Sequence, residues 1–212
     1  MITLYAITDH PTPPVPRLGQ LRVIPSGDLA AVCGPATGGE VTAQALWQHE
    51  RLVEALMQDR DVLPVRYGTR LPDDDAAART LQDNHAEFTA SLEAVRGAAE
   101  LAVRVFAGAA GAPAATPPSE PTTGTAYLRA RARSAAAASD AGMIVHEPLS
   151  RAARAATSAQ VNRPGELLRA AYLVEREAIA SFSARVQEIQ DGNPHLRITC
   201  TGPWPPYSFT RR

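Results

Sequence analysis

The sequence predicts an α+β protein built from two modules, and three observations support that prediction. Short stretches with the alternation of a strand are interspersed with longer stretches of helical periodicity in both halves of the chain. Residues 107–122 consist of small residues, prolines and one glutamate, which cannot bury enough apolar surface to order themselves. The 212 residues suffice for two small domains, and 45% hydrophobic with 20% charged residues is typical of globular proteins.

These observations define four segments. We expect an N-terminal α+β domain at residues 1–106 and a flexible linker or exposed loop at 107–122. A C-terminal domain follows at 123–200, and an aromatic and proline-rich tail occupies 201–212.

The strands of the first half are expected to form a small sheet. Residues 2–7 alternate apolar and polar side chains, and residues 21–24 and 29–33 flank a Pro-Ser-Gly-Asp turn, which is typical of a hairpin. Residues 62–67 are also strand-like. Pro64 cannot donate to a sheet ladder, so it must lie at an edge, a bulge or the start of that strand.

Two amphipathic helices are expected in the same half. Thr42 can cap the first, which runs to Asp59. Pro72 opens the second, and the three aspartates that follow it meet the positive end of the helix dipole. The second helix is expected to continue to Ala99, with a strand after it at 101–106. The apolar stripes consist of Leu46, His49, Val53 and Leu56 in the first helix and Leu81, His85, Phe88, Leu92, Val95 and Ala99 in the second.

The second half begins with an alanine- and arginine-rich helix from about Thr125. Pro148 should break or kink this helix, because proline lacks the amide hydrogen and collides with the preceding turn. A short buried strand at 171–174, a helix at 175–190 and a final strand at 196–200 complete the expected elements.

Composition excludes several functions. The net charge of −1 provides no overall field for nucleic acid or an anionic membrane. All 21 basic residues are arginine, which excludes lysine-based Schiff-base or phosphate-loop chemistry. The five histidines are scattered and the aspartates after Pro72 fit no calcium loop, so we expect no catalytic residue, cofactor or metal. Cys33 and Cys200 are expected to be reduced and mostly buried.

The segment at 201–209 is the most unusual in the sequence, with three prolines and three aromatic residues directly after a strand. Prolines favour an extended backbone and lower the entropy lost on docking, while Trp204, Tyr207 and Phe209 provide large apolar areas. Two interpretations, which do not exclude each other, remain open. The tail folds back and fixes the two halves together, or it anchors a partner, since tryptophan and tyrosine dominate interface hot spots.

Residues 201–209 closely resemble the C-terminal signature of the GvpL/GvpF family of gas vesicle proteins. The resemblance extends, in the family's order, to residues 4–7, His49, residues 62–69, 124–128 and 171–174. It implies an N-terminal α+β domain of unusual topology and a C-terminal domain similar to a ferredoxin fold.

The resemblance also implies an accessory role in gas vesicle formation, through contact with the small hydrophobic shell protein and with other vesicle proteins. We therefore expect a non-catalytic assembly factor in the cytoplasm and at the gas vesicle, with neither nucleic acid nor lipid membrane as partner. A soluble helper can cover the apolar surface of the shell protein with an edge strand or an aromatic tail. The hypothesis for that surface is Trp204, Tyr207 and Phe209, with the edge formed by Arg66 and Tyr67.

Two alternatives accompany this hypothesis. In the first, a cleft between the modules binds a small ligand or catalyses a reaction, with Arg66, His49 or His85 inside. Both histidines lie on apolar stripes, where a histidine is more often a hydrogen-bonded core or interface residue than a catalytic base. In the second, the protein is a scaffold that associates with itself.

Overall fold

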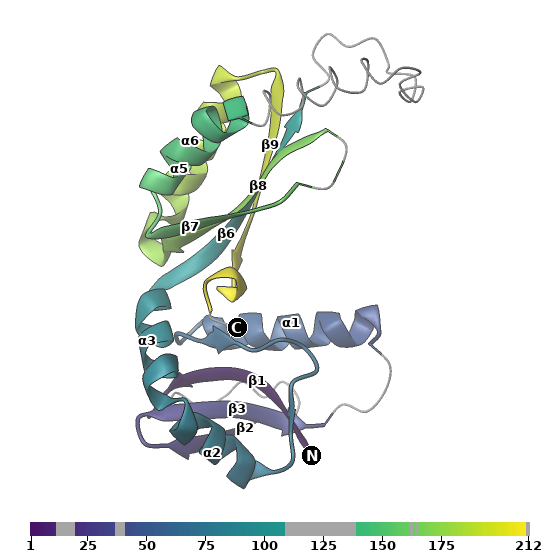
Figure 1. The fold of residues 1–212 in the computed structure, drawn as a ribbon, viewed down its shortest axis with the longest axis vertical. Helices are drawn as coiled ribbons and strands as arrows, with labels where there is room; N and C mark the ends of the chain where they lie inside the picture. The colour runs from purple at the N-terminus through teal and green to yellow at the C-terminus, as the bar shows by residue number, and fades with distance from the viewer. Residues whose placement is uncertain (12–19, 37–40, 109–138, 162, 164, 211–212) are drawn as a thin grey trace. The chain divides into compact units, whose positions relative to one another are not determined.

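The computed structural model describes residues 1–11, 20–36, 41–108, 139–161, 163 and 165–210 (Figure 1). The chain divides into two compact units. The N-terminal unit comprises Met1–Glu100 together with Trp204–Arg212, and the C-terminal unit comprises Leu101–Pro203. Each unit combines a β-sheet with helices, which confirms the predicted α+β class.

The sheet of the N-terminal unit has the strand order β2-β3-β1-β4, and β5 also pairs with β1. The predicted hairpin forms: β2 and β3 pair antiparallel around a turn in which Gly27 has a φ of 64°, a left-handed conformation that favours glycine. The central strand β1 is buried along seven of its eight residues, because neighbouring strands cover its edges and α1 and α3 pack against it. The strands are β1 (Ile2–Asp9), β2 (Arg22–Ser26), β3 (Leu29–Pro35), β4 (Leu63–Pro64) and β5 (Arg70–Leu71).

The strand expected over 62–67 is shorter than predicted. Leu63 and Pro64 form β4, and the Val65 amide adds a hydrogen bond to the Tyr5 carbonyl of β1 before the chain turns to β5, which begins at Arg70. The turn closes when the Thr69 amide and hydroxyl both donate to the Arg66 carbonyl. Pro64 lies in the strand that ends the order of the sheet, in agreement with its missing donor.

Three helices pack on this sheet: α1 (Ala43–Met57), α2 (Asp74–Asp83) and α3 (His85–Val95). Thr42 caps α1 as predicted, since its hydroxyl accepts from the Ala45 amide at 3.1 Å. Asp73, rather than a residue after it, caps α2, and its carboxylate accepts from the Ala76 amide at 2.8 Å. Pro72 therefore lies just outside the helix.

The continuous helix predicted from Pro72 to Ala99 is wrong, because it breaks at Asn84. There φ is −115° and ψ is 19°, and the Asn84 side chain donates to the Thr80 carbonyl. Such a local side-chain bond competes with the helical ladder. His85 consequently leaves the apolar stripe: it is exposed and bonds to Asp28 at 2.5 Å. Ala98 and Ala99 belong to the following strand, which starts earlier than expected.

The C-terminal unit has the strand order β7-β8-β6-β9. With helical segments after the first and third strands, this is the β-α-β-β-α-β order of the ferredoxin-like fold that the resemblance implied. The strands are β6 (Ala98–Ala107), β7 (Ala155–Ala159), β8 (Glu166–Glu175) and β9 (Leu196–Trp204). The helical segments are η1 (Gly142–His146), α5 (Glu147–Arg151), η2 (Arg176–Ala178) and α6 (Ile179–Gly192).

Tyr172 is at the centre of the core of this unit. It is fully buried, its ring lies 5.3 Å from that of Phe182 on α6, and its hydroxyl bonds to His146 at 2.8 Å. The partner of the Tyr172 hydroxyl therefore comes from the π-helical turn η1, whose five residues directly precede α5.

Pro148 does not break the helix in which it lies. The helical stretch continues through it, but it changes from the π-helical turn η1 to the α-helical α5 directly before Pro148. A π-helical turn is a distortion of the helical ladder, so the predicted break does not occur and the helix is distorted instead. The residues expected to start this helix, about 125–138, lie outside the described residues, as does the expected linker from residue 109 onward.

Strand β7 was not predicted, and the buried strand expected at 171–174 is part of the ten-residue β8. Four of the five residues of β7 are exposed, so no apolar alternation indicates a strand there. Strand β7 is instead defined by its antiparallel pairing with β8. The helix expected at 175–190 is α6, shifted to 179–192, and the final strand continues four residues past Cys200.

Candidate functional site

The tail, residues 201–212, begins as the end of β9 and then docks on the N-terminal unit. Pro205 and Pro206 are buried, and Tyr207–Phe209 form the short turn η3. Tyr207 and Phe209 are partly buried, whereas Trp204 remains 40% exposed. The three predicted aromatic residues therefore differ in accessibility: two pack against the unit, and Trp204 is presented beside them.

Glu100, near the start of β6, holds the tail in place. One of its carboxylate oxygens accepts from the Ser208 amide and the other from the Ser208 hydroxyl, each at 2.8 Å. Glu100 is only 8% exposed, and burial raises the pKa of its carboxyl while the two bonds from Ser208 lower it. A buried carboxylate without such donors would be costly, so the tail and Glu100 stabilise each other.

Tyr207 connects the tail to α1, because it lies beside Glu50 of that helix. Its buried hydroxyl lies beside the Glu50 carboxylate, and no described group reaches it at ordinary hydrogen-bonding geometry. Burial, followed by the nearby charge of Glu50, raises the pKa of Tyr207. Burial also raises the pKa of Glu50, with a contribution from Glu54, while the Tyr207 hydroxyl opposes the shift.

Arg66 and Tyr67 lie in the turn between β4 and β5, and they face different cavities. Arg66 is exposed and lines a cavity of about 290 Å³ together with Tyr207 and Thr210 of the tail. Tyr67 lines a second cavity of about 610 Å³. The structure thus brings Arg66 and Tyr207 together, whereas Tyr67 belongs to a separate site.

The second cavity is lined in part by His49, which the sequence analysis placed on an apolar stripe and, in the first alternative, in a cleft between the modules. His49 is 2% exposed; its ring stacks on Tyr5 at 5.0 Å and meets the edge of Tyr67 at 5.6 Å. Its Nε2 lies 2.8 Å from the Val65 carbonyl oxygen. Burial lowers the pKa of His49, so the neutral imidazole is favoured.

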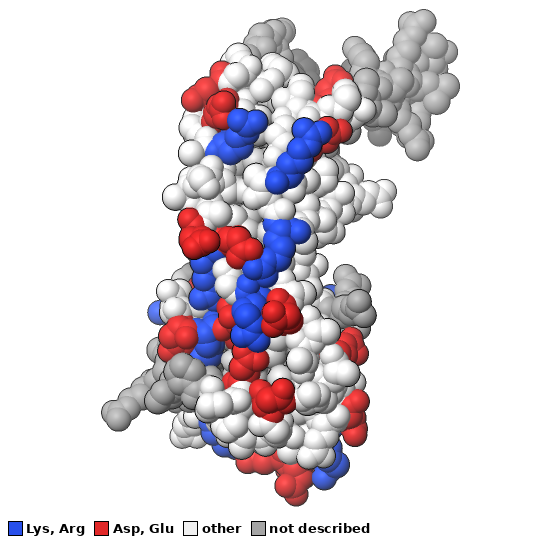
Figure 2. Space-filling view, turned by 90° about the vertical axis from the view of Figure 1, so that its left-hand side faces the viewer, with Lys and Arg blue, Asp and Glu red and all other residues white. Residues whose placement is uncertain are grey.

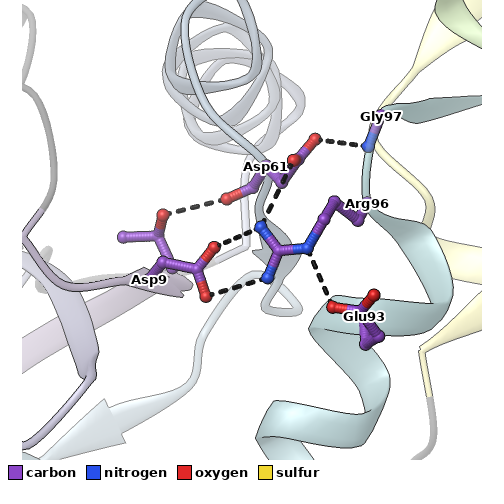
Figure 3. Close-up of polar contacts among 6 residues, drawn as sticks. Asp9, Asp61, Glu93, Arg96 and Gly97 are labelled. Atoms are coloured by element: carbon purple, nitrogen blue, oxygen red, sulfur yellow. Dashed lines mark hydrogen bonds and ion pairs between the residues drawn. The ribbon is translucent and has the colours of Figure 1, made fainter.

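A polar cluster fixes the junction of α3 and β6 (Figure 3). Glu100, which bonds to the tail, follows this junction in β6. Arg96 donates to both carboxylate oxygens of Asp9, at 2.7 and 3.3 Å, and to Glu93 at 2.9 Å. Asp61 accepts from the Gly97 amide at 2.9 Å and lies 4.0 Å from Arg96. The hydrogen bonds to Asp9 and then to Glu93 raise the pKa of Arg96. No sequence pattern indicated this cluster, because its members come from separate, unremarkable segments.

The face of the N-terminal unit that carries α3 has both acidic and basic side chains. Figure 2 shows acidic and basic side chains interspersed over the face that carries α3. The ion pairs of the unit include Arg96 with Asp9 and Arg22 with Asp74, the latter at 2.6 Å. On this face, acidic and basic groups therefore largely neutralise each other.

Other features of the described residues limit the chemistry. Within them, no three histidine, cysteine or carboxylate side chains gather as a metal site would require. Cys33 and Cys200 are free thiols; Cys33 is buried and Cys200 partly so, and burial raises the pKa of both. No helix in the described part is long and apolar enough to cross a membrane.

Comparison with known proteins gives consistent matches along the whole chain. The family model described as gas vesicle synthesis protein GvpL/GvpF matches residues 2–211. Gas vesicle protein L of Streptomyces sp. (strain CB03234) is 32% identical over 225 residues, which cover 89% of this chain and 82% of that protein. Gas vesicle protein F of the same strain is 29% identical over 222 residues, with coverage of 93% and 89%. The crystal structure of GvpF from Microcystis aeruginosa superposes with a TM-score of 0.82 at 16% identity, covering 100% of this chain and 99% of that one, and so shows the same fold.

Proposed function

The chain belongs to the GvpL/GvpF family of gas vesicle synthesis proteins, and from this premise we propose that it binds the small hydrophobic shell protein and assists vesicle nucleation and assembly. Membership of the family makes it a gas vesicle accessory protein. The finer proposal is that it acts without catalysis, in the cytoplasm and on the growing vesicle, through direct contact with the shell subunit.

A physical requirement supports a binding role. A small and very apolar shell protein released into water exposes surface that drives aggregation. A helper that covers this surface until the subunit is incorporated keeps the subunit competent for assembly. Such a helper needs an apolar contact whose conformation is set in advance, because a fixed side chain loses less entropy on binding.

Trp204 is the observation that carries the proposal. It is 40% exposed, yet the residues that follow it are held by two buried prolines and by the bonds between Ser208 and Glu100. An exposed tryptophan next to an anchored segment of backbone is suited to the centre of an interface hot spot. Tyr207 and Phe209 belong to the same docked tail, and Arg66 lines one cavity with Tyr207; these three residues are proposed to complete the contact. Tyr67, which lines the other cavity, contributes at most at its edge.

Co-expression with the shell protein, followed by capture through a tag on this chain, tests the proposal. Wild-type protein should retain soluble shell protein, and Trp204→Ala should weaken the affinity about thirtyfold, the effect of a hot-spot truncation of about 2 kcal/mol, and so clearly reduce the captured amount. Trp47→Ala is the matched control, since Trp47 is the chain's other tryptophan and is 67% exposed on α1. Equal capture by the two variants, with both folded, would remove the tail from the binding surface.

The alternative of a ligand-binding or catalytic cleft gains one specific observation. His49, which that alternative placed in a cleft between the modules, lies in a cavity lined by residues of the N-terminal unit alone. For His49, this alternative therefore concerns a cavity of the N-terminal unit.

A further inference from the structure

We propose that the C-terminal unit binds an extended acidic segment of a partner protein on the outer face of its sheet, the face opposite to α5 and α6. Four arginines form the contact: Arg104 on β6, Arg169 on β8, Arg197 on β9, and Arg163, three positions before β8. We call them the arginine face. The contact goes beyond the proposed binding of the shell protein, which uses the tail of the N-terminal unit.

The alternation of the strands places these side chains on the outer face. The helices α5 and α6 lie on one side of the sheet (Figure 1), and the odd-numbered residues of β6 at 101–105 belong to the core beneath them. Arg104 and Phe106 therefore point to the outer face. Leu196 of β9 belongs to the same core, so its neighbour Arg197 points outward as well. The Arg197 guanidinium lies over the Phe106 ring at 4.6 Å, in agreement with this orientation.

Glu166 connects Arg169 and Arg163 to this face. Its carboxylate accepts from Nε of Arg169 at 3.0 Å and from Nη2 of Arg169 at 2.7 Å, and it lies 3.9 Å from Nε of Arg104. The hydrogen bond from Arg169 lowers the pKa of Glu166, and the charges of Arg169, Arg104 and Arg163 add to this effect. All three guanidinium groups therefore lie around one carboxylate.

The arginine face carries a surplus of positive charge. Among the residues that the structure describes, Glu166 is the one carboxylate that pairs with any of the four arginines, so three positive charges are left. All four remain accessible: Arg163 and Arg197 are exposed, and the side chains of Arg104 and Arg169 are 43% and 32% exposed. A cluster of guanidinium groups with so little neutralisation attracts an anionic partner.

The spacing of the arginines favours an extended segment with carboxylates on alternate residues. Arg104 and Phe106 are two positions apart on β6, about 7 Å along the strand, and the Arg197 guanidinium covers Phe106. Carboxylates on alternate residues of an extended segment have the same spacing and lie on one side of it. Each can accept two parallel hydrogen bonds from a guanidinium, which makes arginine well suited to such a partner.

Single-stranded RNA is the other polyanion that a four-stranded sheet can bind, and the side chains of this face disfavour it. Sheets that bind RNA stack two or three bases on aromatic side chains. Phe106 is the one aromatic residue that the four strands present beside these arginines, and Arg197 already covers its ring. Tyr172 lies in the core, and Trp204 is at the far end of β9. Acidic protein is therefore the better match.

Fluorescence anisotropy with two labelled peptides tests the proposal on the full-length protein. The first peptide alternates glutamate with threonine, and the second has the same composition with all its glutamates in one block. The alternating peptide should bind saturably at low salt and more weakly as salt is added. The block peptide should bind about threefold more weakly, because fewer of its carboxylates match the arginines. A labelled oligouridylate of equal charge should also bind more weakly than the alternating peptide.

Substitutions with the same change of charge locate the site. Arg104→Gln and Arg197→Gln should each weaken binding of the alternating peptide about fivefold. Arg185→Gln, on α6, where Arg185 pairs with Glu188, should leave it unchanged. Trp204→Ala should also leave it unchanged, which separates this contact from the proposed contact with the shell protein. All four side chains are at least 40% exposed or classed with the exposed residues, so the variants should fold, and thermal unfolding checks this.

Amide chemical shifts provide a second measurement. Addition of the alternating peptide should shift the amide signals most at residues 104–106, Glu166 and Arg197. Absence of saturable binding, equal affinity for the two peptides, or tighter binding of the oligouridylate would overturn the proposal. Equal effects of Arg185→Gln and Arg197→Gln would also overturn it, because they would show attraction to overall charge alone.

Discussion

Glu100 and Ser208, 108 positions apart in sequence, are joined by two hydrogen bonds of 2.8 Å, one from the Ser208 amide and one from its hydroxyl. The carboxylate lies near the start of β6, beside the junction that Arg96 and Asp61 fix. The end of the chain is thereby bound to the unit that contains its beginning. This contact holds Trp204 in a defined position, which the proposed binding of the shell protein requires.

Removal of the Glu100 carboxylate should release the tail. Glu100→Ala removes both bonds and should lower the free energy of unfolding by about 2 kcal/mol, whereas Ser208→Ala removes one and should lower it by about 1 kcal/mol. Urea unfolding measures both values, and limited proteolysis reports on the tail. A larger loss in Ser208→Ala than in Glu100→Ala would contradict the assignment of Glu100 as the main anchor.

Glu50 predicts a pH dependence of stability. Burial raises its folded-state pKa above the unfolded value, so the folded state binds the proton more tightly. Its contribution to stability is therefore fully present below the unfolded pKa and is lost as pH rises through the folded pKa. Glu50→Gln has no such titration, and its stability relative to wild type should increase between about pH 4 and pH 7.

Urea unfolding at several pH values between these limits measures the effect. Glu177→Gln, an exposed substitution in the C-terminal unit, provides the control and should follow wild type at each pH. A Glu50→Gln variant that loses stability relative to wild type as pH rises would reverse the predicted sign.

Arg96 should not tolerate lysine. A lysine cannot donate to both oxygens of Asp9 and to Glu93 in the geometry of the guanidinium, so Arg96→Lys should cost about 1 kcal/mol even at this half-exposed position. Arg185, which forms an exposed pair with Glu188 alone, provides the comparison, and Arg185→Lys should change stability by less than about 0.5 kcal/mol. Thermal unfolding of both variants measures the two losses of stability. Equal losses would show that the Arg96 cluster stabilises the fold no more than a single surface ion pair does.

Two glycines should respond to alanine in opposite directions. A Cβ at Gly108 would lie 2.7 Å from the His195 carbonyl oxygen, which is backbone and cannot move aside, so Gly108→Ala should destabilise by about 1–3 kcal/mol. A Cβ at Gly142 would meet nothing within 4 Å in its helical turn, so Gly142→Ala should stabilise by about 0.5 kcal/mol. Chemical denaturation of the two variants measures both changes in the free energy of unfolding. If Gly108→Ala left that free energy unchanged, the backbone at the end of β6 and at His195 could move apart without cost.

Much of the fold could be predicted, because periodicity reports which face of an element is buried. The hairpin of β2 and β3, helix α1 with its Thr42 cap and the alternation of elements in the second half all follow from local patterns. The break at Asn84 could not be predicted from the apolar stripe, since the hydrophobic spacing continues across it. A polar side chain that bonds to the Thr80 carbonyl determines it. Strand β7 depends on its partner β8 and carries almost no local signal.

In the candidate site, too, some residues could be predicted from the sequence and others could not. The aromatic residues of the tail could be selected from composition, and the structure brings Tyr207 and Arg66 to one cavity. No sequence pattern indicated Glu100, because a single glutamate at the start of a strand is usually exposed. Its role depends on Ser208, which lies far along the chain. The unpaired nitrogen of His49 likewise depends on which atom meets the Val65 carbonyl, and only the fold determines that.

Photo-crosslinking at position 204 tests the central claim most directly. Trp204 is replaced by a benzophenone-bearing phenylalanine analogue, the protein is co-expressed with the shell protein, and covalent adducts are identified by mass spectrometry after irradiation. Met143, 57% exposed in the C-terminal unit, is the control position. If the docked tail binds the shell protein, the adduct at position 204 will be much stronger than at position 143. An adduct of equal strength at both positions, or none at 204 while wild-type protein captures the shell protein, would contradict that claim.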